Sequence, residues 1–358
     1  MVENRLLASL LAATKRGTVI ARVCRADDRL LALLVQEKKD SERNPRFQHD
    51  FKTLVDVFLQ EVVKHDLSLC DTFTNSKGEV FGEENNEFLT DEGTILVEVK
   101  PTLEETTSLL NKVVKDQDAS RVLAECAHNN VDVDFYCDIN LDVILPEKIG
   151  VWIDPIDSTS EYIQGRKDDQ SALVRSGLPC VTILIGVFNM DTGEPLIGVV
   201  KQPFFKFRNG SWSGRLVYGY NIGDHRGINQ DFSNIPVNKI VAVSSSEDNH
   251  IKETLQNHGY TTVELAGAGY KLLSIISGDV SAYVLSKPTT YFWDVCAGNA
   301  ILNACGGGVV DFSTLEPIKY RGGVSLQECC NAGGILAFRN SEIKDDLITI
   351  LNLKTSKT

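Results

Sequence analysis

The stretch Gly150-Val151-Trp152-Ile153-Asp154-Pro155-Ile156-Asp157-Ser158-Thr159 ends an apolar run in two carboxylates that lie three residues apart. A proline disfavours helical backbone at the residue before it, so we expect Asp154 to lie at the end of a strand. Ser158 or Thr159 is suited to cap a helix that begins there. Carboxylates, the Ile156 carbonyl and the N–H groups of a helix start would then share one small volume, which suits hard cations and phosphate. A single copy of this pattern fits an ordinary turn and cap equally well, so partners elsewhere in the chain must decide.

The chain has 358 residues, of which 42% are hydrophobic, enough to bury one large core or two moderate ones. Its 36 Lys and Arg against 49 Asp and Glu give a net charge of -13. This charge argues against binding to nucleic acids or anionic membranes. An anionic substrate would need local positive charge, which divalent cations captured by clustered carboxylates would supply.

Nine cysteines are scattered without any Cys-x-x-Cys spacing, which favours reduced thiols in a cytoplasmic setting. The first 24 residues have apolar side chains at helical spacing and no uninterrupted apolar segment, so we predict neither a signal peptide nor a membrane span. The expected oligomeric state is a monomer or a homodimer.

Hydrophobic spacing predicts both helices and strands. Helices are expected over residues 4–24, 29–37, 53–65, 102–114, 120–128, 249–258, 270–277, 294–305 and 341–351. Strands are expected over residues 78–82, 180–188, 195–200, 211–220, 240–244, 282–285, 308–312 and 334–338. The turn 191–193 predicts a hairpin between two of these strands. Irregular order and antiparallel pairs together favour an α+β layered architecture over a doubly wound parallel sheet.

Four further acids lie at or near the ends of predicted elements. Asp56 falls within the first turn of a predicted helix, Glu83 and Glu84 follow a strand, and Asp294 precedes a helix of small residues. Each fits an ordinary role when taken alone, as a capping acid or part of a solvated loop. Those ordinary explanations become weaker when the acids are considered together with Asp154 and Asp157.

Four motifs in this order resemble the magnesium-dependent, lithium-inhibited phosphomonoesterases, a family that includes inositol monophosphatase, fructose 1,6-bisphosphatase and the bisphosphate nucleotidases. They are Lys52-Thr53-Leu54-Val55-Asp56, Gly82-Glu83-Glu84, Asp154-Pro155-Ile156-Asp157-Ser158-Thr159 and Trp293-Asp294. The resemblance spans nearly the whole chain and implies a layered α/β/α/β/α sandwich. It also implies an N-terminal half, residues 1–170, with most metal ligands, and a C-terminal half, residues 171–358, with Asp294 and the substrate pocket. The two halves are expected to form one catalytic unit.

The resemblance further implies two or three Mg2+ ions, with Li+ as an inhibitor. Glu83, Asp154 and the Ile156 carbonyl would hold one ion, and Asp154 would bridge to a second ion held by Asp157 and Asp294. Asp56 and Glu84 would complete a third, weaker site. The implied catalytic residues are Asp56, Thr159 and Glu83, with Thr159 and Asp56 orienting the attacking water. Two such ions can clamp an in-line displacement at phosphorus.

The implied substrate contacts are Asp157, Ser158, Thr159, Ser246, Gly267, Ala268 and Lys271. Lys271 would meet a second phosphate, although a helix start with a surface lysine is the simpler interpretation of its segment. Relatives place a lysine two residues after the position of Ser246, where this chain has Glu247-Asp248. That difference bears on how a distal phosphate is bound.

Details outside the four motifs resemble the branch of the family that acts on inositol polyphosphates. They include Asn86-Glu87-Phe88 and Tyr162-Ile163-x-Gly165. The implied activity is removal of the 1-phosphate from inositol 1,4-bisphosphate and inositol 1,3,4-trisphosphate. One alternative is a 3'(2'),5'-bisphosphate nucleotidase with the same core, and another is a non-catalytic module that binds divalent cations or inositol phosphates. The Asp56 and Thr159 pair argues against the latter, since pure binding needs no group to orient water.

Overall fold

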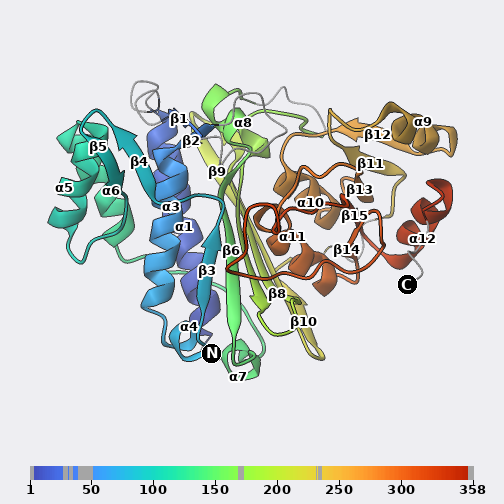
Figure 1. Ribbon diagram of the computed structural model, residues 1–358, viewed down its shortest axis with the longest axis horizontal. Helices are drawn as coiled ribbons and strands as arrows, with labels where there is room; N and C mark the ends of the chain where they lie inside the picture. The colour runs from blue at the N-terminus through green and yellow to red at the C-terminus, as the bar shows by residue number, and fades with distance from the viewer. Residues whose placement is uncertain are drawn as a thin grey trace.

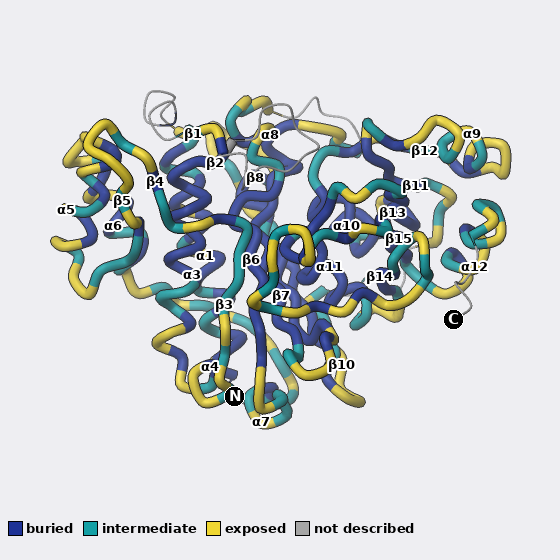
Figure 2. The backbone as a smooth tube through the Cα atoms, in the orientation of Figure 1, coloured by how far each residue is buried: buried dark blue, intermediate teal, exposed yellow. Residues whose placement is uncertain are grey.

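A computed structural model describes residues 4–26, 31, 35–38, 51–167, 173–230, 232 and 236–353. Helices and sheets alternate in five layers across the molecule (Figure 1). The predicted α/β/α/β/α sandwich is therefore confirmed. Figure 2 shows that burial is concentrated in the sheets and in the helices packed directly against both faces of the first sheet.

The first sheet has six strands in the order β10-β9-β8-β7-β6-β3. Their bounds are β3 Glu79–Gly82, β6 Ile149–Asp157, β7 Thr182–Asn189, β8 Pro195–Arg208, β9 Ser211–Ile222 and β10 His225–Ile228. The predicted hairpin is the antiparallel pair β7–β8, whereas β3 runs parallel to β6. Strand β6 lies inside the sheet and is buried along its whole length, as its apolar sequence predicts.

The second sheet has five strands in the order β12-β11-β13-β15-β14. Their bounds are β11 Ile240–Val243, β12 Thr261–Glu264, β13 Ala282–Leu285, β14 Gly308–Asp311 and β15 Ile335–Phe338. Strand β11 pairs in parallel with β12 and β13, and β15 pairs antiparallel with β13 and β14. This mixture of pairings fits the α+β prediction.

The longer helices form the other three layers. They are α1 Arg5–Ala26, α3 Leu54–Ser68, α5 Leu103–Val114, α6 Gln117–His128, α9 Asn249–Asn257, α10 Ala268–Ile276, α11 Phe292–Ala304 and α12 Ser341–Ile350. Helices α1 and α3 cover one face of the first sheet, with α5 and α6 outside them (Figure 1). Helices α10 and α11 lie between the sheets, and α9 and α12 cover the far face of the second sheet (Figure 1).

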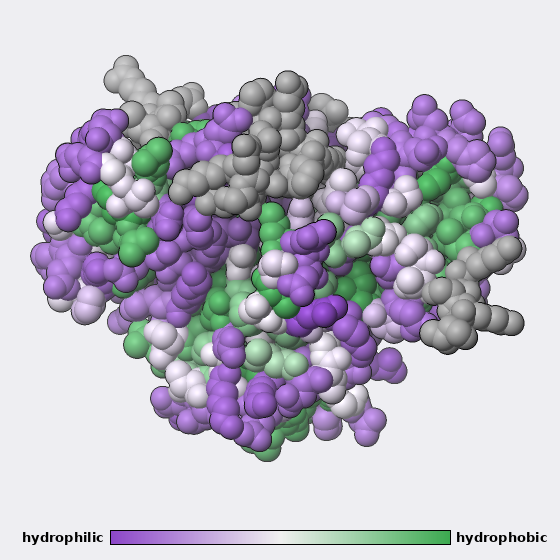
Figure 3. Space-filling view, viewed as in Figure 1, coloured by the Kyte–Doolittle hydropathy of each residue, from purple (hydrophilic) through white to green (hydrophobic). Residues whose placement is uncertain are grey.

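Short elements complete the described chain. They are α4 Asp71–Asn75, α7 Leu141–Ile144, α8 Thr159–Gln164, the 3-10 turn Leu178–Cys180, and the paired strands β1 Val35–Glu37 with β2 Phe51–Thr53 and β4 Glu87–Thr90 with β5 Gly93–Leu96. We predicted a helix over residues 29–37, but residues 35–37 form strand β1, so the prediction is wrong there. Most of the other residues of that range lie outside the described chain. The face in Figure 3 is largely hydrophilic over α5, α6 and α9, as solvent-exposed outer helices require.

The predicted boundary between the two halves, at residues 170 and 171, lies outside the described chain, so that division stays a prediction. The first sheet combines β3 and β6, which precede this point, with β7 to β10, which follow it. Among the described residues, no helix has the length and apolar character needed to cross a membrane.

Helix α11 packs directly against two glycines of the first sheet. A Cβ atom on Gly198 would lie 2.0 Å from the carbonyl oxygen of Ala297, and one on Gly186 would lie 2.6 Å from the Ala297 nitrogen. Neither contact is sterically possible, so a side chain at either position would push the helix away. The two glycines on β7 and β8 thus let α11, the helix that carries Asp294, lie directly against this sheet.

Candidate active site

The acidic stretch lies on β6, which continues to Asp157 and does not end at Asp154 as we predicted. Asp154 pairs with Leu184 of β7 and Asp157 pairs with Thr182, so three steps on β6 oppose two on β7. This irregularity contains Pro155, which has no N–H to donate to a ladder. In a regular strand, side chains three residues apart point to opposite faces. The extra residue cancels that alternation and brings both carboxylates to one side.

Asp294 is the third residue of α11, since the helix begins at Phe292. The helix therefore begins two residues earlier than we predicted, and Asp294 takes part in capping it as the third residue of a capping box. Its Oδ2 accepts a hydrogen bond of 2.6 Å from the backbone N–H of Tyr291, which precedes the helix. A carboxylate in the first helical turn is also stabilised by the helix dipole.

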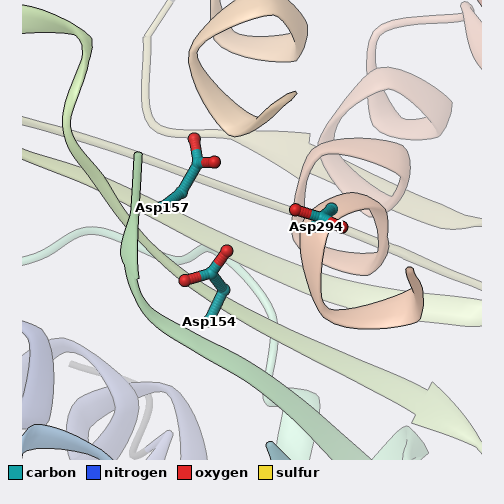
Figure 4. A group of neighbouring side chains, drawn as sticks. All are labelled: Asp154, Asp157 and Asp294. Atoms are coloured by element: carbon teal, nitrogen blue, oxygen red, sulfur yellow. The ribbon is translucent and has the colours of Figure 1, made fainter. Parts of the chain in front are cut away.

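The carboxylates of Asp154, Asp157 and Asp294 form the centre of the site. Each offers a ligand oxygen, and these oxygens all lie within 4.8 Å of one another. Figure 4 shows the three side chains turned toward a common space, two from β6 and one from α11. The three residues were expected to act together, and the structure brings them together.

The hydrogen bonds of this cluster leave room for a cation. Asp157 accepts from Thr182 Oγ1 at 3.0 Å and from the backbone N–H groups of Gly269 at 3.0 Å and Ala268 at 3.3 Å. By contrast, Asp154 Oδ1 is buried and has no hydrogen-bond partner within the described chain. An orphaned buried carboxylate oxygen is costly unless a cation or proton compensates it.

The raised pKa values of these carboxyl groups also indicate that a cation or proton must compensate their charge. Burial, followed by the nearby charges of Glu83, Asp157 and Asp294, raises the pKa of Asp154 well above its ordinary value. Burial also raises the pKa of Asp157, although Lys271 opposes that shift. Carboxylates that repel one another in a buried site hold protons, unless a bound cation lets them ionise.

Glu83 and Glu84 continue the acidic region from the end of β3. The backbone N–H of Glu83 donates to Ile153 O at 3.1 Å, which aligns it beside Asp154 on β6. Lys38 Nζ lies 2.6 Å from a carboxylate oxygen of each glutamate. Burial raises the pKa of Glu84 to about 8, although Lys38 opposes the shift. Glu84 is buried, so it is not part of a solvated loop.

Asp56 is both a capping residue and a buried acid. Thr53 caps α3, and Asp56 Oδ2 accepts hydrogen bonds from the N–H and hydroxyl of Thr53 at 2.7 and 2.6 Å. Burial raises its pKa to about 7, with Glu83 adding to the shift. Its Oδ1 is buried and has no hydrogen-bond partner in the described chain.

Thr159 does not pair with Asp56 in the described chain. Its hydroxyl donates to the Ile156 carbonyl at 3.0 Å, which leaves that oxygen a second lone pair for a metal. Ser158 precedes α8 with left-handed backbone, φ 71°, and makes no side-chain cap bond. The expectation that Ser158 or Thr159 caps this helix through its side chain is therefore wrong.

A cavity of about 620 Å³ opens beside the acidic cluster. Of the predicted residues, those lining it are Glu83, Asp154, Ile156, Asp157, Ser158, Thr159, Gly267, Ala268, Lys271 and Asp294. Asp56, Glu84 and Ser246 are not among the lining residues. The Ser246 hydroxyl instead lies 3.1 Å from Ser244 Oγ, and its neighbour Ser245 lines the cavity.

The wall formed by residues 265–271 depends on one glycine. Gly267 has φ 75°, and a Cβ there would lie 2.6 Å from Ser158 Oγ and 2.7 Å from Asp157 Oδ2. Only glycine combines that backbone with such an approach. Lys271 is buried and is not the surface lysine of the simpler interpretation; its Nζ donates to Gly267 O at 3.0 Å and lies 5.0 Å from the Tyr283 ring centre.

Sequence reasoning missed Lys38, Arg175, Ser245 and Tyr291 as lining residues. Lys38 and Arg175 stand in polar stretches without a motif, so composition gave no signal for them. Tyr291 directly precedes the Phe292-Trp293-Asp294 motif, and this position next to the motif could have identified it as a lining residue.

The donor set suits Mg2+, which prefers oxygen ligands, usually one or two carboxylates with retained waters. Asp154, Asp157 and Asp294 could hold one or more such ions, and Glu83 extends the same acidic surface. The unpartnered oxygens of Asp154 and Asp56 mark where a cation or an ordered water would compensate buried charge.

Comparison with known proteins identifies relatives of this chain. The profile of the inositol monophosphatase family matches residues 59–352. The inositol polyphosphate 1-phosphatase of Mus musculus is 37% identical, with 99% of each chain covered. The Homo sapiens enzyme of that name is 34% identical, again over 99% of each chain.

Solved structures show the same fold at low identity. The extragenic suppressor protein suhB of Bartonella henselae matches with a TM-score of 0.55 and 14% identity, covering 97% of each chain. An IMPase/NADP phosphatase solved with Mg2+ and phosphate matches with a TM-score of 0.50 and 13% identity, covering 96% of this chain and 97% of the other. The length of the family match and the identity to these full-length relatives together show that this chain belongs to the inositol monophosphatase family.

Proposed function

We propose that this phosphoric monoester hydrolase removes the 1-phosphate from inositol 1,4-bisphosphate and inositol 1,3,4-trisphosphate, that it requires Mg2+, and that Li+ inhibits it. The relatives at 34–37% identity, which are named inositol polyphosphate 1-phosphatases, support the substrate class. The single observation that carries the chemistry is the convergence of Asp154, Asp157 and Asp294 at the cavity.

The residues divide the work by position. Asp154, Asp157 and Asp294 would hold the metal, with Glu83 and the Ile156 carbonyl beside them, and Asp56 and Glu84 would serve a weaker site. Bound Mg2+ supplies a Lewis acid that polarises the phosphate and acidifies water. Ser158 and Thr159 would receive the scissile phosphate beside the acids, where the start of α8 exposes backbone N–H groups.

Asp56 and Thr159 are the proposed water-orienting residues. The unpartnered Asp56 Oδ1 can accept a hydrogen bond from the attacking water. Thr159 would have to rotate its hydroxyl from Ile156 O to reach the same water. A histidine is not needed for this chemistry.

The test is phosphate release from purified protein over a panel of substrates, with and without Mg2+. The panel contains inositol 1-phosphate, inositol 1,4-bisphosphate, inositol 1,3,4-trisphosphate and 3'-phosphoadenosine 5'-phosphate. We expect Mg2+-dependent release from the two inositol polyphosphates, and inhibition by millimolar Li+. No release from either polyphosphate would refute the proposal.

The same panel tests the second candidate, a 3'(2'),5'-bisphosphate nucleotidase. The Mus musculus nucleotidase of that name is 29% identical over 58% of this chain, a shorter and weaker match than the polyphosphate enzymes. Preferential turnover of the adenosine bisphosphate would favour it. Three other expectations remain predictions: inositol phosphates as partners, a monomer or homodimer, and a cytoplasmic setting. The nine free thiols agree with a cytoplasmic setting.

A further inference from the structure

A substrate with several phosphates brings more negative charge into the cavity than a monophosphate. The metal at the acidic cluster would serve the scissile group, so every other phosphate needs a cation from the protein. Within the described chain, three cationic side chains line the cavity: Lys38, Lys271 and Arg175. Their surroundings differ, and the difference decides which of them is available to a phosphate at the cavity mouth.

Lys38 and Lys271 both face the acids. Lys38 bridges Glu83 and Glu84, and its side chain is 3% exposed. Lys271 is buried, donates to Gly267 O and acts electrostatically on Asp157. Both are therefore set deep in the cavity beside the acids. A second phosphate that meets Lys271 would lie there too, so a phosphate at the cavity mouth needs a different cation.

Arg175 is placed differently. Its residue is exposed, and it makes no ion pair with any residue that the structure describes. Its backbone is fixed to the cavity wall, because its carbonyl accepts a hydrogen bond of 2.9 Å from Ala266, one residue before Gly267. The acid nearby in the lining, Glu161, is already bound to Arg166 and to the backbone N–H of Gly177.

The stretch of wall at Ser245 offers no cation among the described lining residues. Glu247 is buried and bound to the N–H and hydroxyl of Ser286, and Asp248 caps α9, so neither acid lines the cavity. Lys252 is paired with Glu264 at 2.7 Å. Lys252 and Lys287 also bind the backbone carbonyls of Ser245 and Ser246, and neither lines the cavity. Among the described lining residues, the exposed cation is therefore Arg175.

We propose that Arg175 is a specificity-determining residue that binds a non-scissile phosphate of the substrate and so favours polyphosphorylated inositols over monophosphates. A guanidinium presents paired N–H donors that match phosphate oxygens, and an exposed, unpaired one loses little on binding. This inference rests on the proposed function, because it names the substrate feature that the same cavity selects.

The test compares Arg175→Gln and Arg175→Lys with wild type on inositol 1-phosphate, inositol 1,4-bisphosphate and inositol 1,3,4-trisphosphate. For Arg175→Gln we expect KM for the two polyphosphates to rise about tenfold, the effect of one charge-assisted contact at an exposed site. We expect kcat and the kinetics on the monophosphate to stay unchanged, and Arg175→Lys to fall in between. Arg226→Gln is the matched control, because it removes an exposed arginine charge on β10 that does not line the cavity.

Two results would overturn the inference. One is an unchanged KM for the polyphosphates in Arg175→Gln, and the other is an equal rise for mono- and polyphosphates. Calorimetric binding of inositol 1,4-bisphosphate in the presence of Ca2+ gives a readout without turnover, and there too Arg175→Gln should bind more weakly. Wild-type protein that neither hydrolyses nor binds this compound would refute the proposed function, and the inference with it. Equal affinity of wild type and Arg175→Gln for inositol 1,4-bisphosphate would refute this inference and leave the proposed function standing.

Discussion

Raising the pH should destabilise the metal-free protein, and Mg2+ should reverse that effect. Burial raises the pKa of Glu84 from 4.5 to about 8. A carboxyl group whose pKa is higher in the folded state keeps its proton there while the unfolded chain has lost it. Stability therefore falls as the pH rises from about 4.5 to about 8.

The size of the effect follows from the same shift. One pKa unit corresponds to about 1.4 kcal/mol. Ionisation of Glu84 alone should therefore lower the free energy of unfolding by about 3 kcal/mol between roughly pH 5 and pH 7.5. With an unfolding entropy on the order of 0.75 kcal/mol/K for a chain of this length, Tm should fall by about 4 °C. Bound Mg2+ favours the ionised carboxylates, so saturating Mg2+ should remove most of the fall.

The assay is thermal unfolding at a series of pH values, in chelator and in Mg2+, for wild type, Glu84→Gln and Glu92→Gln. The glutamine in Glu84→Gln cannot ionise, so the free energy of unfolding of this variant should fall by about 3 kcal/mol less over this pH range than that of wild type. Glu92 is exposed, so Glu92→Gln controls for the change in net charge and should follow wild type. Equal slopes for wild type and Glu84→Gln, or a Tm in chelator that rises with pH, would refute the reasoning.

Three further predictions follow from the site and its support. Gly198→Ala places a Cβ 2.0 Å from Ala297 O and should destabilise the fold by about 1–3 kcal/mol in denaturant unfolding; an unchanged midpoint would contradict the close packing of α11. Asp56→Ala should lower kcat at least about 100-fold while substrate still binds, as measured by calorimetry, and unchanged turnover would remove its assigned role. Millimolar Li+ should inhibit phosphate release in Mg2+, and the absence of inhibition would count against the inferred metal site.

The layered fold was predictable because its elements have strong local signals. The apolar spacing of α1 and α3, the β-branched runs of β7 and β8, and the turn between them specify their own structure. Strands β2, β4, β5, β10 and β12 were missed, since these short strands lack the continuous apolar run that marks β11, β13 and β15. Strand β1 was mistaken for the end of a helix, because three residues cannot distinguish the two periodicities.

The site shows the same limit at the level of single residues. The motifs gave the three central acids, but their common orientation depends on the irregular pairing of β6 with β7, which sequence spacing does not reveal. The start of α11 was misplaced because Asp is a good capping residue and also a good third residue of a helix. Lys38 and Arg175 reach the cavity through tertiary structure alone, so no local pattern could identify them.

The central claim is that Asp154, Asp157 and Asp294 hold the Mg2+ on which hydrolysis depends. The most direct test is the Mg2+ dependence of phosphate release from inositol 1,4-bisphosphate by wild type and Asp294→Asn. The asparagine keeps an oxygen that can accept from the Tyr291 N–H, so the start of α11 should be preserved. We predict that wild type needs Mg2+ and that Asp294→Asn is slower by at least about 100-fold with a higher Mg2+ requirement. Release without Mg2+, or a folded Asp294→Asn that works at the wild-type rate, would contradict the claim.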